Sequence, residues 1–173
     1  MQESTKSMNH SKTDEITLKQ DELLEHWQGH RRLTRKAIDA FPEDKLFSYS
    51  IGGMRPFSEL AMEMIHMAAP GARGVATGEW TQFGEKEVEG SPGTPKTKDE
   101  LLKLWDWSTD QINKNWEQIQ PGRLQMVDLA FGQYEGKVWW HVLYFIDNEI
   151  HHRGQGYVYL RSLGIEPPYF WER

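Results

Sequence analysis

The chain has 173 residues, of which 38% are hydrophobic, and a net charge of −6. This length suits one domain with a substantial core, and the acidic balance argues against a nucleic-acid partner, because nucleic-acid binders usually carry a basic surface. Cysteine is absent, which excludes disulfides, thiolate metal ligands and a cysteine nucleophile. The one cluster of positive charge, Arg31, Arg32, Arg35 and Lys36, is interpreted as the solvated face of a helix.

The sequence shows no membrane or targeting segment. No apolar run reaches the ~18–20 residues that span a bilayer, and the polar residues 1–13 have no signal-peptide core. We therefore expect no membrane partner and a cytoplasmic location. A disordered tail is predicted over residues 1–13 and a single domain over residues 14–173.

The first predicted helix covers residues 14–41, where apolar residues recur every three or four positions. His30 lies on the same face. Pro42 ends this helix, because proline lacks the backbone N–H and clashes with the preceding turn. Residues 43–54 are expected to form a loop.

The second predicted helix begins at Pro56, a favoured first helical residue, and contains His66 among apolar neighbours. It is expected to stop near Pro70 and the glycine that follows, since both residues disfavour helix interiors. A second amphipathic piece is predicted over residues 75–83. Residues 84–96 are rich in Gly, Pro, Ser and charge and are expected to form an exposed loop.

The third predicted helix has a clear start signal, since Thr97 and Glu100 form the pattern of a capping box. It is expected to end before Pro121. Residues 123–136 alternate in polarity and predict a short hairpin or turn. The fourth helix is predicted over residues 138–163.

Four long helices with long connecting loops predict an all-α fold, a four-helix bundle. The aromatic tail, residues 165–171, contains two prolines and is expected to pack back on the domain or on a second subunit. The tryptophans at positions 105, 107, 116, 139 and 140 suit a core or a dimer interface. A homodimer is therefore expected.

The most distinctive feature is the run Glu-Ile-His-His-Arg-Gly-Gln-Gly at residues 149–156, within the apolar fourth helix. Imidazole and guanidinium groups resist burial unless they are paired, hydrogen-bonded or bound to metal, so this helix is expected to carry a metal site or a buried polar network. Spacings of three and four residues place one set of side chains on a single face: His141, Phe145, Asn148, His152, Gln155 and Tyr159. His151 is turned about 100° away from that face.

The sequence resembles the DinB family, within the wider superfamily of DinB and YfiT-like metalloenzymes. The resemblance rests on His-His-Arg-Gly-Gln at residues 151–155, the tyrosine-rich stretch and Leu-Arg that follow, Gly-Ile-Glu-Pro-Pro at residues 164–168, and His66. It covers nearly the whole folded part. It implies a four-helix bundle of the DinB type, commonly dimeric, that binds a divalent metal ion such as Ni or Zn.

The resemblance also implies a ligand set of three histidines, one on the second helix and a His-x-x-x-His pair on the fourth. The matching positions are His66, Asn148 and His152, so asparagine replaces one histidine. An amide oxygen is a weaker ligand than imidazole for Ni or Zn. Metal binding is therefore expected to be weakened.

Nearby side chains can compensate, because a carboxylate or a further imidazole would complete a site of catalytic type. Candidates for additional ligands, or for groups that hydrogen-bond to a ligand, are Glu63, His141, Asp147, Glu149, His151 and Gln155. The alternative is a polar core without metal, in which His66, Asn148 and His152 hydrogen-bond to one another.

Two functions follow from the resemblance. In the first, the chain is a metal-dependent enzyme acting on small molecules, such as a thiol-dependent S-transferase or a hydrolase, whose partners are a small thiol or an electrophile in stress or detoxification. In the second, it is a non-catalytic dimer associated with stress or damage, and its metal site is degenerate. An open pocket beside Asn148 would favour the enzyme, and a filled site would favour the second function.

Overall fold

The computed structural model describes residues 18–81 and 93–173. This part of the chain is mostly helical, with one small antiparallel sheet. In chain order the elements are α1 (Gln20–Ala40), α2 (Glu43–Leu46), α3 (Phe57–Thr77), α4 (Lys98–Trp116), the 3-10 turn η1 (Arg123–Gln125), β1 (Val127–Ala130), β2 (Tyr134–Lys137) and α5 (Val138–Ser162). The predicted tail over residues 1–13 lies outside the described residues.

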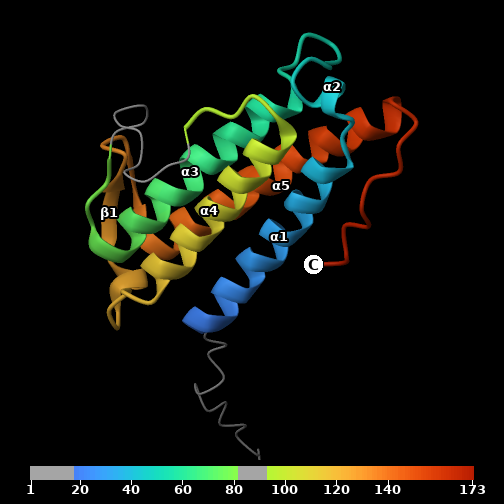
Figure 1. Ribbon diagram of the computed structural model, residues 1–173. Coiled ribbons are helices and arrows are strands. Elements are labelled where there is room, and N and C mark those ends of the chain that lie inside the picture. The colour runs from blue at the N-terminus through green and yellow to red at the C-terminus, as the bar shows by residue number, and fades with distance from the viewer. Residues whose placement is uncertain (1–17, 82–92) are drawn as a thin grey trace, which may run out of the picture.

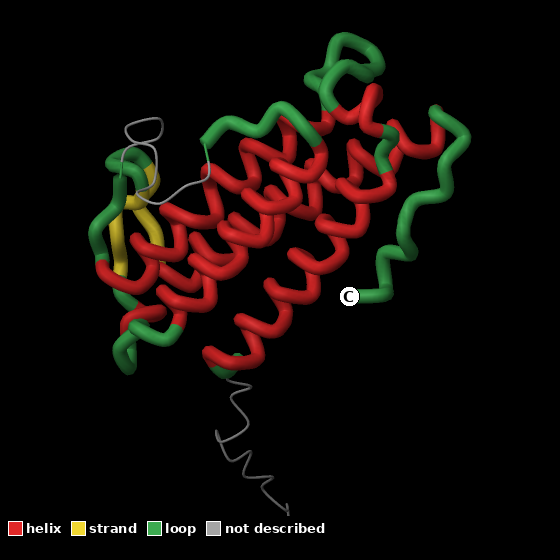
Figure 2. The backbone as a smooth tube through the Cα atoms, in the orientation of Figure 1, coloured by secondary structure: helices red, strands yellow, loops and turns green. Residues whose placement is uncertain are grey.

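The four long helices α1, α3, α4 and α5 lie side by side (Figure 1). The β1–β2 hairpin lies at one end of these helices and α2 lies at the other, and Figure 2 shows how little of the chain is strand. Helix α3 packs most extensively against α4 and α5. Two buried clusters fill the interior, one around Trp27 near the hairpin and one around Phe57 and Trp105.

Helix α3 corrects the prediction that the second helix stops near Pro70. It continues through that proline to Thr77. The segment after the proline consists largely of Ala and Gly, and these small residues let neighbouring aromatic rings approach the helix backbone. A Cβ added at Gly71 would lie 2.7 Å from the Phe145 ring. Burial against these rings outweighs the lost hydrogen bond, since packing of an apolar face supplies most helical stability in proteins.

Other predicted boundaries agree more closely with the structure. The capping box is confirmed, since the Thr97 hydroxyl accepts a hydrogen bond from the Glu100 N–H at 3.2 Å. The short hairpin is confirmed as β1 and β2, which pair from Val127 with Lys137 to Ala130 with Tyr134. The loop predicted over residues 43–54 is interrupted by α2, which starts directly after a proline.

The prediction that the basic cluster of the first helix is solvated is wrong at one residue. Arg31 is fully buried, whereas Arg32 and Arg35 are about half exposed. The Arg31 guanidinium lies 3.3 Å from the centre of the Trp105 ring and donates to that residue's carbonyl oxygen. Cation–π contact and hydrogen bonds compensate for its burial.

The C-terminal tail returns to α1, beside which the chain ends (Figure 1). Arg173 Nη1 lies 3.2 Å from His30 Nε2, and Lys36 donates to the Glu172 carbonyl oxygen at 3.4 Å. The aromatic rings of Phe170 and Trp171 remain exposed. Thus the last two residues contact α1, whereas the Phe170 and Trp171 rings, which the sequence predicts to pack on the domain or on a second subunit, do not pack on the domain. Within the described ranges, no helix combines the length and the apolar character needed to cross a membrane.

Close packing of α5 on α3 gives a first testable prediction. A Cβ at Gly156 would overlap the fully buried Phe57 ring, whereas a Cβ at Gly154 would meet no atom within 4 Å. Gly156→Ala is expected to lower the free energy of unfolding by about 1–3 kcal/mol, because overpacking strains the interface. Gly154→Ala, on the same helix, is expected to raise it by up to about 1 kcal/mol through helix propensity. Urea unfolding of both variants checks this, and equal effects would contradict it.

Candidate functional site

The site lies between α3 and α5, which run antiparallel. Phe57 at the start of α3 packs on Gly156 near the end of α5, and Gly71 packs on Phe145 near the start of α5. This register places Glu63, in the first half of α3, opposite the turn of α5 from Asn148 to His152. The interface is apolar on both sides of this point, so the polar side chains here share a restricted space.

We use the term polar set for Glu63, Asn148, His152 and Gln155. Glu63 Oε1 lies 2.9 Å from His152 Nε2 and accepts from Asn148 Nδ2 at 3.4 Å. On the other side of the imidazole, His152 Nδ1 lies 3.1 Å from Gln155 Oε1. Both nitrogens of His152 are thus held, which fixes the orientation of its ring as supporting residues do at metal and catalytic sites.

Arg55, just before α3, completes the surroundings of Glu63 through an ion pair with Oε2. Partial burial opposes ionisation of the Glu63 carboxyl, but hydrogen bonds from Arg55 and His152 outweigh it and lower its pKa to about 2. Glu63 is therefore a carboxylate at neutral pH. Nothing in the local sequence pattern pointed to Arg55, which reaches Glu63 across eight positions of the chain.

Asn148 carries the one polar atom of this set that is buried without a hydrogen-bond partner among the described residues, its Oδ1. Such an atom is costly unless a further group occupies the space beside it. Together with the Glu63 carboxylate and the His152 imidazole, it offers two oxygen donors and one nitrogen donor. These atoms fit a divalent ion of borderline or hard character. In the part of the chain that is described, no three His, Asp or Glu side chains are already arranged around one point.

His66, the other predicted histidine ligand, is exposed and lies three positions after Glu63 on α3. It makes no hydrogen bond or ion pair with the polar set in the described structure. Pro70, four positions later, has no N–H to donate to the His66 carbonyl oxygen. The helix thus departs from its regular hydrogen bonding at this histidine.

The remaining candidates separate into three places. His151 is exposed and contacts Gln155, with its Nε2 3.2 Å from the amide nitrogen; Asp147 is exposed as well. Glu149 faces α1 and lies outside the polar set. His141 lies near the hairpin, two turns from Asn148 along α5. Thus the structure brings Glu63, Asn148, His152 and Gln155 together.

Glu149 belongs to a second, fully buried polar cluster between α1, α4 and α5. Its carboxylate accepts from Arg31 Nη1 at 3.4 Å and from the Thr34 hydroxyl at 2.7 Å, and Arg153 Nη1 lies 3.9 Å away. Arg153 in turn donates to the His30 carbonyl oxygen and approaches its Nδ1 at 3.0 Å. Burial lowers the pKa of His30 to about 3, so its ring is neutral. This cluster is satisfied internally and fits a structural role.

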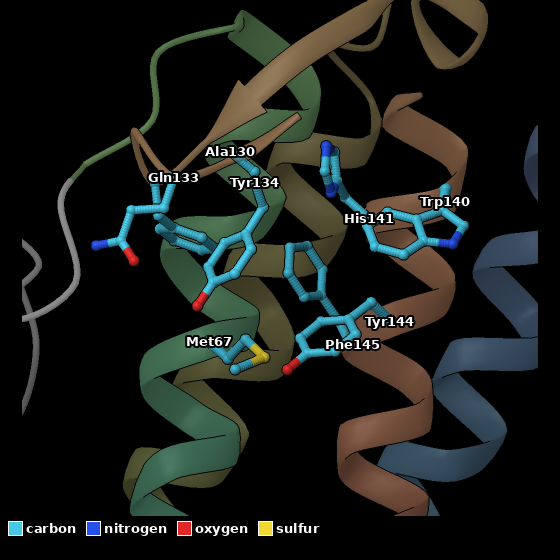
Figure 3. Close-up of a pocket in the computed structure, with 9 residues that line it drawn as sticks. Met67, Ala130, Gln133, Tyr134, Trp140, His141, Tyr144 and Phe145 are labelled. Carbon is cyan, nitrogen blue, oxygen red and sulfur yellow. The ribbon is translucent and has the colours of Figure 1, made fainter. Parts of the chain in front are cut away.

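A cavity of about 600 Å³ begins beside Met67, one turn after Glu63 on α3. We call it the aromatic pocket, because most of its lining comes from rings: Phe131, Tyr134, Trp140, His141, Tyr144 and Phe145. Figure 3 shows the hairpin residues Gln133 and Tyr134 on one side and residues of α5 on the other. Asn148, His66 and His152 do not line this cavity.

A family model and two solved structures are similar to this chain. The model of the DinB family matches residues 1–172. A solved DinB-like protein of Bacillus subtilis, YjoA, is 18% identical, with a TM-score of 0.68 over 87% of this chain and 99% of that chain. A DinB-like protein of Bacillus cereus is 16% identical, with a TM-score of 0.67 over 86% and 95% of the two chains. A search of curated proteins gives no match. These structures are similar in fold to this chain.

Proposed function

This chain belongs to the DinB family, and we propose that it is a metal-dependent enzyme that acts on small molecules. The observation that carries the proposal is the convergence of Glu63 Oε1 and His152 Nε2, 2.9 Å apart, beside the buried and unpartnered Oδ1 of Asn148. In this proposal the fold is a four-helix bundle of the DinB type. The site replaces one family histidine with a carboxylate.

The proposed ligands are His66, Glu63 and His152, with Asn148 as a weak oxygen donor. His66 and Glu63 lie three positions apart on α3, so their side chains leave the helix on the same face. A two-histidine, one-carboxylate set is a known catalytic type that leaves positions open for water or substrate. The more oxygen-rich set extends the choice of ion from Ni and Zn to Mn.

Each residue of this site has a definite role in the proposal. Gln155 holds the His152 ring through Nδ1, so that Nε2 faces Glu63. Arg55 holds the second oxygen of Glu63 and keeps the carboxyl ionised. A bound divalent ion would supply Lewis acidity toward water or a small thiol. The proposed reaction is either the transfer of a small thiol to an electrophile or the hydrolysis of that electrophile. Either reaction would serve stress response or detoxification.

Metal content tests this proposal. Protein purified without an affinity tag is incubated with Ni, Zn or Mn, desalted and analysed for metal. We expect close to one ion per chain in the wild type, and loss of that ion in His152→Ala and Glu63→Ala, because each variant removes a donor. His26→Ala is the control, since that imidazole is exposed on α1 and belongs to no contact of the polar set; it is expected to keep the ion.

A second candidate function is favoured by one observation. Glu63 already has partners for both oxygens, from Arg55 on one side and from Asn148 and His152 on the other. Such a closed set fits a non-catalytic, stress-associated homodimer whose metal site is degenerate. Wild-type protein that takes up none of the three ions would overturn the enzyme proposal and leave this one. Light scattering then checks for the dimer.

A further inference from the structure

We propose that the aromatic pocket binds an uncharged, planar aromatic molecule that carries one hydroxyl or N–H group. Only the role of the bound molecule rests on the proposed function. In that role the molecule is the substrate, and its reactive end lies at the polar set. Binding itself requires no metal ion, and the two proposals can therefore fail separately.

The size and lining of the pocket select for a planar ligand. Its volume of about 600 Å³ falls within the range of small-molecule sites. Tyr134 from the hairpin and Tyr144 from α5 stand on different sides of the space (Figure 3). Trp140 stacks on Tyr144 with ring centres 6.2 Å apart and an angle of 25°. A planar molecule fits between such walls, because aromatic rings prefer offset-stacked or edge-to-face contacts.

The charge of the lining selects for a neutral ligand. None of the described residues that line the pocket is Asp, Glu, Lys or Arg. An ionised ligand would lose its hydration without gaining a counter-charge, which is costly in an apolar site. The ion pair of Glu63 with Arg55 lies outside this lining. The ligand is therefore uncharged over the part that enters the pocket.

Among the described residues of the lining, His141 supplies the one buried polar side chain. It is 2% exposed and makes edge-to-face contacts with Trp80 and Trp140, at ring-centre distances of 5.5 and 5.3 Å. Its Nε2 has no hydrogen-bond partner among the described residues. A neutral imidazole has one donor and one acceptor nitrogen. A hydroxyl group can serve either nitrogen, so a phenol-like ligand would pair with His141 in either tautomer.

The pocket and the polar set are neighbours along both helices. Met67, in the pocket, lies four positions after Glu63 on α3, and Tyr144 lies four positions before Asn148 on α5. Four positions are about one turn, or roughly 5.4 Å of helix. Met67 and Tyr144 therefore mark the end of the pocket that faces the polar set. Tyr134, Trp140 and Tyr144 are about half exposed, so this aromatic wall is open to solvent.

Two matched probes test the inference: 2-naphthol, and 2-methylnaphthalene, which has a similar shape and no hydroxyl. Equilibrium dialysis against EDTA-treated protein gives the dissociation constant of each. We expect the wild type to bind 2-naphthol about fivefold to tenfold more tightly than 2-methylnaphthalene, since one hydrogen bond distinguishes them. His141→Phe is expected to remove this preference and to keep the binding of 2-methylnaphthalene.

The walls of the pocket are tested with a matched pair of tryptophans. Trp140→Ala removes a wall and is expected to weaken both probes about tenfold, whereas Trp171→Ala removes an exposed ring of the tail and is expected to change neither. Trp140 is about half exposed and Trp171 more so, so both variants are expected to fold, which circular dichroism checks. If Trp140→Ala bound each probe as tightly as the wild type does, the inference would be overturned. An unchanged preference in His141→Phe would overturn the role of the hydroxyl.

Metal content of the same preparations separates the two proposals. Naphthol binding by a protein that takes up no ion supports the pocket and contradicts the metal-dependent enzyme. Metal uptake by a protein that binds neither probe supports the enzyme and contradicts the pocket.

Discussion

Replacing Glu149 with glutamine is expected to lower the free energy of unfolding by about 3–5 kcal/mol, because it leaves a buried cation without its counter-charge. Arg31 and Glu149 are only 1% and 2% exposed, and no solvent reaches them to compensate. Glutamine preserves the size of the side chain and a hydrogen-bond acceptor for Thr34. The loss therefore reports the charge rather than the packing.

Urea unfolding of the wild type and Glu149→Gln measures this effect. Asp106→Asn is the matched control, because Asp106 pairs with Arg35 on the surface, where both side chains are nearly half exposed. Its expected cost is below about 1 kcal/mol. A loss for Glu149→Gln no larger than that of the control would contradict the buried ion pair.

Glu149→Gln leaves two buried cations, Arg31 and Arg153, without their carboxylate, and the double variant Arg31→Met, Glu149→Leu leaves only Arg153. Replacing both partners of a buried ion pair by apolar groups of similar volume is often neutral or stabilising. We expect the double variant to be more stable than Glu149→Gln alone. The opposite order would mean that the Arg31 hydrogen bonds to Ser108 and the Trp105 carbonyl oxygen, which the double variant also removes, outweigh the gain from removing one unpaired cation.

The arrangement of α5 was predictable from its spacing. Asn148, His152 and Gln155 recur at steps of four and three, and the structure places all three in one hydrogen-bonded set. The same spacing also put His141 on this face. Two turns of helix separate it from Asn148 by roughly 10 Å, and so His141 lies in the aromatic pocket instead. Periodicity predicts which face a residue occupies, and it does not predict what lies opposite.

The residues that the sequence did not reveal depend on contacts between helices. Arg31 sits in a run of basic residues, and only the approach of Glu149, 118 positions later, distinguishes it from its exposed neighbours. Arg55 is likewise distinguished only by its ion pair with Glu63. Pro70 is the reverse case, in which a strong local signal for a helix end is overridden because the small residues after it allow close packing. Family membership was recognisable, by contrast, because the closing motif is local.

Asp128→Asn is expected to lower the free energy of unfolding by about 3 kcal/mol, because it leaves the buried Arg123 guanidinium unpaired. Asp128 accepts from Arg123 Nη1 at 2.8 Å and from the Trp80 indole at 2.6 Å, and Arg123 also donates to the Gly74 carbonyl oxygen at 2.9 Å. These bonds join the hairpin to the end of α3. The variant should therefore also weaken the side of the aromatic pocket where Trp80 packs on His141.

The ion pair of Arg123 with Asp128 also predicts that stability depends on pH. The Asp128 carboxyl sets the direction of this dependence. Hydrogen bonding from Arg123 lowers the pKa of Asp128 below its ordinary value of 3.8. Its contribution is therefore fully present above that value and is lost as the pH falls further and the folded carboxyl is protonated. Urea unfolding between pH 7 and pH 2.5 should show a steeper loss of stability in the wild type than in Asp128→Asn. Parallel curves for the two proteins would mean that Arg123 does not depend on the charge of Asp128.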